Sequence, residues 1–389
     1  MTESPPLLVF ADDWGRHPSS CQHLVRELLP TYQVIWVNTI GTRPPKLNFS
    51  TLKRGLGKLR QWSSQSKKGL IANENLQVLN PRMWPGFSTA WQRRLNRSLL
   101  LSQLLPVLQK MSQPPIAIST IPIVADVMKR LPVQSWVYYC VDDFSIWPGL
   151  DGRTLGFMER EMLPQTNSII AASEHLQERL RSLGYSSNLL THGVNLDFWK
   201  MASDDEVIPG LESLERPLIV FWGVIDQRMD ISFVRQLSQE IDTGTIVLAG
   251  PEDEPDAELR RLPRVKLQGA LPLKSLPRMA QAASVLIMPY ADLPVTQAMQ
   301  PLKLKEYLAT GKPAVVRNLP ANKTWSDCLD VVETPSEFVS KVKERISNGI
   351  LAEQMLARRR LVDESWKSKA ETFARLLHND MKRDSPSIA

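Results

Sequence analysis

The sequence predicts an α/β fold made of two Rossmann-like domains that face each other across a cleft. The chain has 389 residues, which is too long for one ordinary domain and suits two domains of roughly 150 to 200 residues each. Short apolar runs alternate with helical patterns in both halves, as the strand-helix-strand units of a parallel sheet require. An acidic, loosely patterned stretch, SDDEVIPGLESLER at positions 203–216, separates the two series.

The first series begins with a buried strand at 7–11, after which Ser19 or Ser20 can cap a helical pattern that contains Leu24, Val25, Leu28 and Leu29. Further short apolar runs predict strands at 33–38, 116–119, 135–140 and 168–172. The lengths between these runs leave room for helices. The first half is therefore expected to form a parallel, doubly wound sheet.

A second series of strands is predicted after the acidic stretch. It comprises 217–222, 245–249, 265–268, 285–288 and 314–316, with helices at 276–283 and 302–309 among them. The chain ends in an amphipathic pattern over 364–377, where Trp366, Ala370, Phe373 and Leu377 share one stripe. These elements describe a second Rossmann-like domain followed by a terminal helix.

Composition excludes several other classes of protein. Hydrophobic residues make up 43% and charged residues 23%, close to the globular average. Cys21, Cys140 and Cys328 lie far apart without a C-x-x-C pair, so neither a disulfide framework nor a zinc site is expected. The amino terminus lacks the basic start of a signal peptide, and no apolar run reaches 18 residues. We expect a cytoplasmic protein whose membrane contact, if it has any, is peripheral.

The segment at 300–313, QPLKLKEYLATGKP, contains the strongest candidate for a binding site. Pro301 marks a helix start and Gly311 its stop. Lys303 and Lys305 fall in the first turns, where the helix dipole disfavours cations unless an anion is near. A bound diphosphate would resolve this conflict, with Glu306 accepting hydrogen bonds from a ribose diol. The alternative is an ordinary ion pair between Lys303 and Glu306 on a solvated face.

The same segment resembles the donor-site motif of retaining GT-B glycosyltransferases similar to family 4, also called group 1. Further segments occur in the matching order: DDWGRHPSS, YYCVDDFSIWPG, AASEHLQERL, THGVNLDFW, FWGVIDQRMD and VLIMPY. The resemblance spans nearly the whole chain. It implies an acceptor domain at 1–200, a nucleotide-sugar donor domain at 217–360, and a helix at 361–389 that crosses back to the first domain.

The resemblance implies that Gly223, Arg228, Lys303 and Glu306 bind the donor. This sequence departs from the family motif at two positions. Family members often carry a second glutamate eight positions before Glu306, where this chain has Ala298. The loop after the first strand of the donor domain supplies Arg228 but no lysine. Neutralisation of the diphosphate would therefore rest on Arg228 together with Lys303.

The acceptor domain contributes two further groups of candidates. Asp142 and Asp143 follow the predicted strand at 135–140 and are the candidate catalytic residues, able to orient the donor sugar or to bind acceptor hydroxyls; their alternative role is to cap a loop or helix. Trp14, Gly15 and Arg16 follow the first strand and are the candidate acceptor-binding residues, with Arg16 able to pair with an acceptor phosphate.

No Asp-x-Asp triplet occurs, the usual arrangement by which other glycosyltransferases hold a divalent ion on the donor. A metal-independent reaction without a cofactor is therefore expected, in which the helix amino terminus and basic side chains stabilise the leaving diphosphate.

The expected partners are a nucleotide-sugar donor and a saccharide or lipid-linked acceptor, in the synthesis of a cell-surface polysaccharide or glycolipid. No nucleic acid partner is expected. The segment 43–68 has eight Lys and Arg and no acid, so it suits an anionic membrane surface or is a solvated loop. Two other functions remain open, a GT-B-like nucleotide-sugar epimerase and a non-catalytic nucleotide-sugar-binding or scaffold protein.

Overall fold

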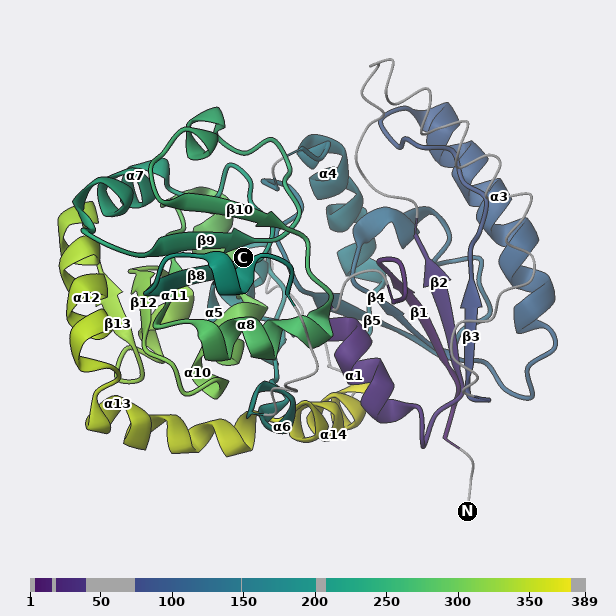
Figure 1. The fold of residues 1–389 in the computed structure, drawn as a ribbon. Helices are drawn as coiled ribbons and strands as arrows, with labels where there is room; N and C mark the ends of the chain where they lie inside the picture. The colour runs from purple at the N-terminus through teal and green to yellow at the C-terminus, as the bar shows by residue number, and fades with distance from the viewer. Residues whose placement is uncertain (1–3, 16–18, 40–73, 148, 201–207, 379–389) are drawn as a thin grey trace, which may run out of the picture. The chain divides into compact units, whose positions relative to one another are not determined.

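The computed structural model describes residues 4–15, 19–39, 74–147, 149–200 and 208–378. The chain divides into two compact units, one of residues 1–190 with 370–389 and the other of residues 191–369. Each unit contains one parallel sheet, and helices accompany both sheets (Figure 1). The α/β fold of two Rossmann-like domains that the sequence predicts is therefore present.

The sheet of the first unit has seven strands in the order β3-β2-β1-β4-β5-β6-β7. In chain order the strands are β1 Leu7–Ala11, β2 Val34–Asn38, β3 Leu76–Leu79, β4 Ile116–Ser119, β5 Ser135–Cys140, β6 Ser168–Ala171 and β7 Asn188–Leu189. The chain order reverses between β1 and β4. In sheets of this kind, ligands bind beyond the carboxyl ends of the strands at such a reversal.

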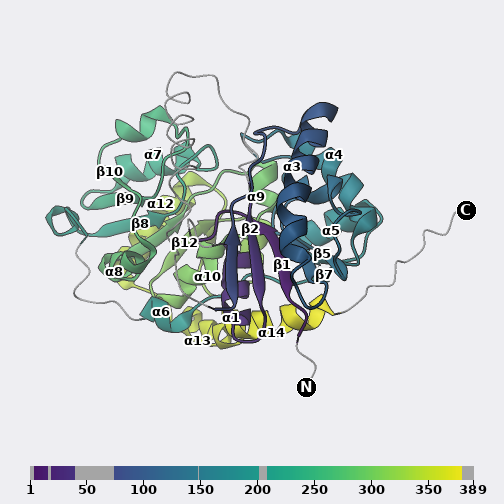
Figure 2. The same ribbon diagram turned by 90° about the vertical axis from the view of Figure 1, so that its right-hand side faces the viewer.

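The helices of the first unit pack on both faces of this sheet (Figure 2). They are α1 Ser20–Leu28, α3 Ala90–Leu108, α4 Gly152–Met162, α5 Glu174–Ser182 and the end of α14 Trp366–Leu377. Neighbouring residues of β5 point to opposite faces. The Tyr138 hydroxyl donates to Glu159 of α4, 2.7 Å away, whereas the Tyr139 ring lies 5.4 Å from that of Phe373 in α14.

The second unit repeats the same plan with six strands in the order β10-β9-β8-β11-β12-β13. These strands are β8 Leu218–Trp222, β9 Thr245–Ala249, β10 Val265–Gly269, β11 Val285–Met288, β12 Ala314–Arg317 and β13 Asp330–Val332. Every residue of β8, β9 and β11 is buried. The reversal here lies between β8 and β11, so a ligand site is expected beyond the ends of these two strands.

Helices cover both faces of the second sheet. They are α6 Leu196–Lys200, α7 Ile231–Glu240, α8 Leu276–Ala282, α9 Pro294–Ala298, α10 Leu302–Ala309, α11 Pro320–Lys323, α12 Pro335–Asn348 and α13 Ala352–Ala357. Helices α7 and α12 lie together on one side, where the rings of Phe233 and Phe338 are 5.3 Å apart (Figure 1). Helix α10 begins after Pro301, and Gly311 follows it with a φ of 75°, so both predicted boundaries of this helix are confirmed.

No helix among the described residues is long and apolar enough to cross a membrane. The segment 43–68 lies outside the described residues.

Candidate active site

Helix α10 places Lys303 at the point where the strand order of the second sheet reverses. The Lys303 ammonium donates to the hydroxyl of Tyr290, which follows β11, over a distance of 2.6 Å. It also lies 4.2 Å from the centre of the Phe221 ring in β8 and 4.9 Å from that of Tyr290. Among the described residues no carboxylate forms an ion pair with Lys303. Aromatic groups rather than a carboxylate thus hold the ammonium, which suits it to contact an anion.

Gly223 makes room for this ammonium. Its φ is 139°, a conformation that residues with side chains rarely adopt, and a Cβ atom built there would lie 2.0 Å from the Lys303 Nζ. Gly250, which follows β9, approaches from the other side, since a Cβ on it would lie 1.8 Å from the carbonyl oxygen of Gly223. Two glycines therefore let the ends of β8 and β9 pack closely beneath Lys303.

Glu306 lies one turn further along α10 and is held by Trp222, the last residue of β8. The indole N–H of Trp222 donates to Glu306 Oε2 over 3.1 Å. Burial raises the pKa of Glu306 to about 7, while the Trp222 hydrogen bond and the nearby Lys303 charge partly oppose this rise. Trp222 is itself stacked on Trp199 of α6, with ring centres 5.3 Å apart. A packed aromatic pair therefore fixes the position of the carboxyl group.

The side chain of Lys305 points away from the reversal of the sheet where Lys303 lies. This side chain is buried and forms an ion pair with Glu364, and its ammonium also donates to Thr191 Oγ1 over 3.2 Å. Burial lowers the pKa of Lys305 to about 8, although the Glu364 charge opposes this. Of the two lysines in the first turns of α10, only Lys303 lies at the reversal of the sheet.

Arg228 is placed near Lys303 but its charge is already compensated. The guanidinium pairs with Asp226 at 2.7 Å and lies 5.9 Å from the Tyr290 ring, whose hydroxyl Lys303 contacts. Its Nη1 is 3.7 Å from the sulfur of Met299, the residue after Ala298. Ala298 is itself buried. Arg228 therefore shares an aromatic neighbour with Lys303, but contributes less net charge to an incoming anion.

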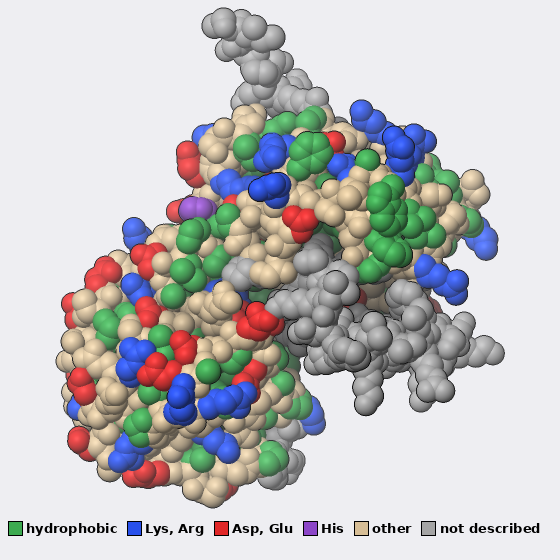
Figure 3. Space-filling view, turned by 90° about the horizontal axis from the view of Figure 1, so that it is seen from above, with side chains coloured by type: hydrophobic (Ala, Val, Ile, Leu, Met, Phe, Trp, Pro, Cys, Tyr) green, Lys and Arg blue, Asp and Glu red, His purple; other side chains and the backbone are tan. Residues whose placement is uncertain are grey.

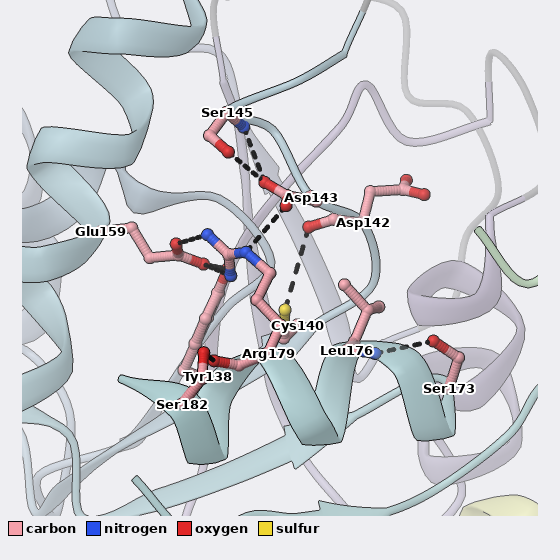
Figure 4. Close-up of polar contacts among 10 residues, drawn as sticks. All are labelled: Tyr138, Cys140, Asp142, Asp143, Ser145, Glu159, Ser173, Leu176, Arg179 and Ser182. Atoms are coloured by element: carbon pink, nitrogen blue, oxygen red, sulfur yellow. Dashed lines mark hydrogen bonds and ion pairs between the residues drawn. The ribbon is translucent and has the colours of Figure 1, made fainter. Parts of the chain in front are cut away.

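In the first unit, Asp143 belongs to a buried network of charged groups (Figure 4). Its carboxylate pairs with Arg179 Nε of α5 at 2.7 Å and accepts a hydrogen bond from the backbone N–H of Ser145 at 3.0 Å. Arg179 also pairs with Glu159 of α4, which accepts a hydrogen bond from Tyr138. Asp143 therefore stabilises the loop after β5 by linking it to Arg179.

Asp142 is arranged differently. Its carboxylate points away from Arg179 and the Asp143 carboxylate (Figure 4), and its side chain is partly exposed. The Asp142 carbonyl oxygen is 3.8 Å from the sulfur of Cys140. Of the two predicted catalytic residues, Asp142 is thus the one whose carboxylate points away from Arg179.

Trp14 and Gly15 lie beyond the end of β1 in a loop that polar side chains hold in place. The backbone N–H of Trp14 donates to Asn38 Oδ1 over 2.8 Å, and that of Gly15 donates to Gln22 Oε1 over 3.0 Å. The Trp14 ring contacts Trp36, with centres 4.7 Å apart. Gly15 has a φ of 78°. Arg16 lies outside the described residues, so the predicted acceptor group is placed only in part.

Three residues of these sites were not singled out from the sequence. Tyr290 and Trp222 position Lys303 and Glu306, and Arg179 compensates Asp143. Each lies far from its partner in the sequence, and the segments FWGVIDQRMD and VLIMPY contain the first two without marking their roles. Among the described residues, no group of three or more His, Cys, Asp and Glu side chains could hold a metal ion.

A family model described as "Glycosyl transferases group 1" matches residues 216–348. These residues contain β8 to β13 together with Gly223, Lys303 and Glu306. Over these residues the chain is similar to the group 1 glycosyltransferases, and its two parallel sheets have the arrangement of the GT-B fold.

One curated relative is TuaH of Bacillus subtilis (strain 168), whose name assigns it to teichuronic acid biosynthesis as a glycosyltransferase. It is 29% identical over 174 residues, which are 42% of this chain and 43% of that protein. The match therefore spans less than half of the relative.

Solved structures match over almost the whole chain. Sucrose-phosphate synthase from Thermosynechococcus elongatus has a TM-score of 0.71 at 14% identity and covers 96% of this chain and 98% of its own. HepE of Anabaena in complex with UDP and glucose has a TM-score of 0.66 at 13% identity, with 96% and 99% covered. At these identities the structural likeness establishes the fold.

Proposed function

We propose that this chain transfers a sugar from a nucleoside-diphosphate sugar to an acceptor, and that the second unit binds the donor. The Lys303 ammonium carries this proposal, because it is held over Gly223 at the reversal of the sheet without a carboxylate partner among the described residues. Isolated cations in such a position suit phosphate oxygens. The family match of residues 216–348 and the UDP and UDP-glucose complexes of HepE support this assignment.

In the proposed complex, Lys303 and the amino terminus of α10 contact the diphosphate while Glu306 accepts hydrogen bonds from the ribose hydroxyls. Negative charge grows on the diphosphate as the bond to the sugar breaks. Lys303 stabilises that charge, which is electrostatic catalysis by a group already in place. Arg228 contributes less, because Asp226 compensates it.

The finer parts of the proposal concern stereochemistry, metal and acceptor. Retention of configuration and metal independence rest on the resemblance to family 4 and on the lack of an Asp-x-Asp triplet in the sequence. Asp142 is the proposed contact to the sugar or acceptor from the first unit, with Trp14 and Gly15 on the acceptor side. The name of TuaH supports an acceptor in a cell-surface polysaccharide. A cytoplasmic enzyme with its basic segment 43–68 on the inner membrane face is part of the same proposal.

The first test measures donor binding. We expect UDP at 100 times its Kd to stabilise the wild-type chain by about 2.7 kcal/mol in a thermal shift assay. Lys303→Ala should weaken UDP binding at least tenfold, since an isolated charge-assisted contact contributes about 1.5 to 3 kcal/mol. Lys266→Ala, at an exposed lysine of β10 in the same unit, is the matched control and should bind as the wild type does. Equal UDP affinity in Lys303→Ala and the wild type would refute the donor site.

The second test separates a transferase from a non-catalytic binding protein. Slow release of UDP from UDP-sugars by the wild type, lost in Glu306→Ala and Lys303→Ala, is the expected result. EDTA should leave the rate unchanged, and a loss that Mg²⁺ or Mn²⁺ restores would contradict metal independence. Nucleotide binding without any turnover would favour a scaffold, for which the missing glutamate at Ala298 is the supporting observation.

A further inference from the structure

The start of α3 carries an exposed aromatic surface in the first unit. Trp84 is 43% exposed and Trp91 54%, and their ring centres are 5.4 Å apart. Leu95, one turn along α3 from Trp91, is 37% exposed. We call Trp84, Trp91 and Leu95 the α3 patch. Side chains of this size are usually buried, and an apolar patch of a few hundred Å² is often a functional surface.

The chain holds the α3 patch in place. Trp84 lies in the segment before α3, and its backbone N–H donates to the side chain of Asn96 over 2.6 Å. The Asn96 amide in turn donates to the carbonyl oxygens of Trp84 and Gly86, at 3.1 and 2.9 Å. Asn96 is buried on the inner side of α3. The exposed position of Trp84 is therefore fixed by a specific contact rather than by a loose loop.

The charged side chains of α3 and of residues 80–89 before it are all arginines. Helix α3 contains no acidic residue. Arg93 pairs with Asp126 and Glu161, so the charges of these two carboxylates are compensated. Arg82 and Arg94 are exposed, and neither has an ion pair within the part of the chain that the structure describes. In Figure 3, hydrophobic side chains and Lys or Arg side chains lie near one another on the surface.

We propose that the α3 patch docks on an anionic lipid surface. Tryptophan is enriched where membrane and water meet, and arginines can lay their stems on apolar surface while their charged ends reach lipid phosphates. A protein partner fits less well. The exposed parts of the three side chains amount to roughly 300 Å², well below the ~800 Å² per partner of a stable protein interface. This proposal is independent of the donor site in the second unit.

The test is co-sedimentation of the full chain with vesicles of phosphatidylglycerol or of phosphatidylcholine. The wild type should bind phosphatidylglycerol vesicles and bind phosphatidylcholine vesicles at least tenfold less. Replacing both tryptophans, Trp84→Ala with Trp91→Ala, should lower binding at least tenfold. Arg82→Gln with Arg94→Gln should lower it severalfold and weaken its dependence on salt. Leu356→Ala, at a side chain that is 59% exposed on α13, is the matched control and should bind as the wild type does.

A further variant tests the competing source of binding, the basic segment 43–68, by changing Lys53, Arg54, Lys58 and Arg60 to Gln. The proposal is overturned if the double tryptophan variant binds as the wild type does, if wild-type binding is equal on both lipids, or if the wild type binds neither. The milder variant Trp91→Gln should also bind less, which keeps the test valid if the double variant misfolds. UDP binding in solution should be unchanged in every variant, so failure here is distinguishable from failure of the donor site.

Discussion

Glycine at 223 and glycine at 250 are required for different reasons. Alanine at 223 would place a methyl group against the end of the flexible Lys303 side chain, whereas alanine at 250 would place one against the backbone of Gly223. A lysine end can move and a packed strand end cannot. Both glycines have a φ that disfavours alanine, so alanine at either position strains the backbone, and only alanine at 223 also displaces the Lys303 ammonium.

The first prediction compares alanine at three glycines. Gly250→Ala should destabilise the chain by about 3 kcal/mol or more, because backbone must move and φ is 153°. Gly15→Ala, where φ is 78° but no atom of the described residues lies within 4 Å of the new Cβ, should cost only about 1 kcal/mol. Gly223→Ala should lose UDP binding by displacing Lys303. Urea unfolding and UDP titration measure these effects. Equal stabilities for the variants at 15 and 250 would show that the contact with the Gly223 backbone does not destabilise the fold.

The second prediction concerns pH. Glu306 has a pKa of about 7 in the folded chain against 4.5 for an ordinary glutamate, so the folded state binds this proton more tightly than the unfolded state. The free energy of unfolding should therefore fall as pH rises from about 4.5 to about 7. A pKa shift of this size corresponds to a loss of about 3 kcal/mol across that range.

Glu306→Gln tests this, since glutamine keeps an acceptor for Trp222 and does not titrate. Urea unfolding of the variant between pH 4.5 and 7.5 should show a flatter pH dependence than the wild type. A pH dependence unchanged by the substitution would show that other groups cause it.

At the scale of elements, buried strands were predicted well because they are continuous apolar runs. The strands at 116–119, 135–140, 245–249 and 285–288 have the predicted bounds. The edge strands β3, β7 and β13 were not predicted, because they have two to four residues and half-exposed or mixed patterns. Their pairing depends on a neighbouring strand rather than on their own sequence.

The candidate site was less predictable than the strands. Helix α10 and its two boundaries follow from Pro301, Gly311 and the helical pattern, so Lys303 could be placed at a helix start. The residues that position Lys303 and Glu306 could not be predicted, because Tyr290 and Trp222 contact α10 only through the tertiary fold. For the same reason the sequence did not distinguish Asp143, which pairs with Arg179, from its neighbour Asp142.

The third prediction concerns the link between α4, α5 and the loop after β5. Arg179→Met leaves Glu159 and Asp143 buried without their cation. Removing one partner of a buried ion pair costs about 3–5 kcal/mol, and we expect a loss near the lower end because Arg179 is 18% exposed. Arg181→Met, which breaks an exposed pair with Glu178 on the same helix, should change stability by less than about 1 kcal/mol.

Thermal and urea unfolding measure both arginine variants. Adding Glu159→Gln and Asp143→Asn to Arg179→Met should restore part of the stability by removing the uncompensated charges. A similar loss in the variants at 179 and 181 would show that the buried network does not hold this loop.

At the scale of the whole molecule, the chain leaves the first unit after residue 190 and returns to it at residue 370. The predicted stripe of the last helix is buried throughout, at Trp366, Ala370, Phe373 and Leu377. Its members divide between the two units, since Trp366 packs against Gly193 of the second unit and Phe373 against Tyr139 of the first. The buried side chains at 370, 373 and 377 are therefore part of the core of the first unit.

The last prediction follows from this connection. Deleting residues 370–389 removes Phe373, which is fully buried, and the hydrogen bond of 3.3 Å between Tyr32 and His378. The first unit should lose stability by more than the 3–5 kcal/mol of a single Phe→Ala change in a core. Calorimetry with limited proteolysis should show cleavage within residues 4–190 at lower temperature than in the wild type. Phe373→Leu, a smaller change at the same position, should cost about 1 kcal/mol. A deletion variant whose first unit melts as the wild type does would mean that α14 contributes nothing to that core.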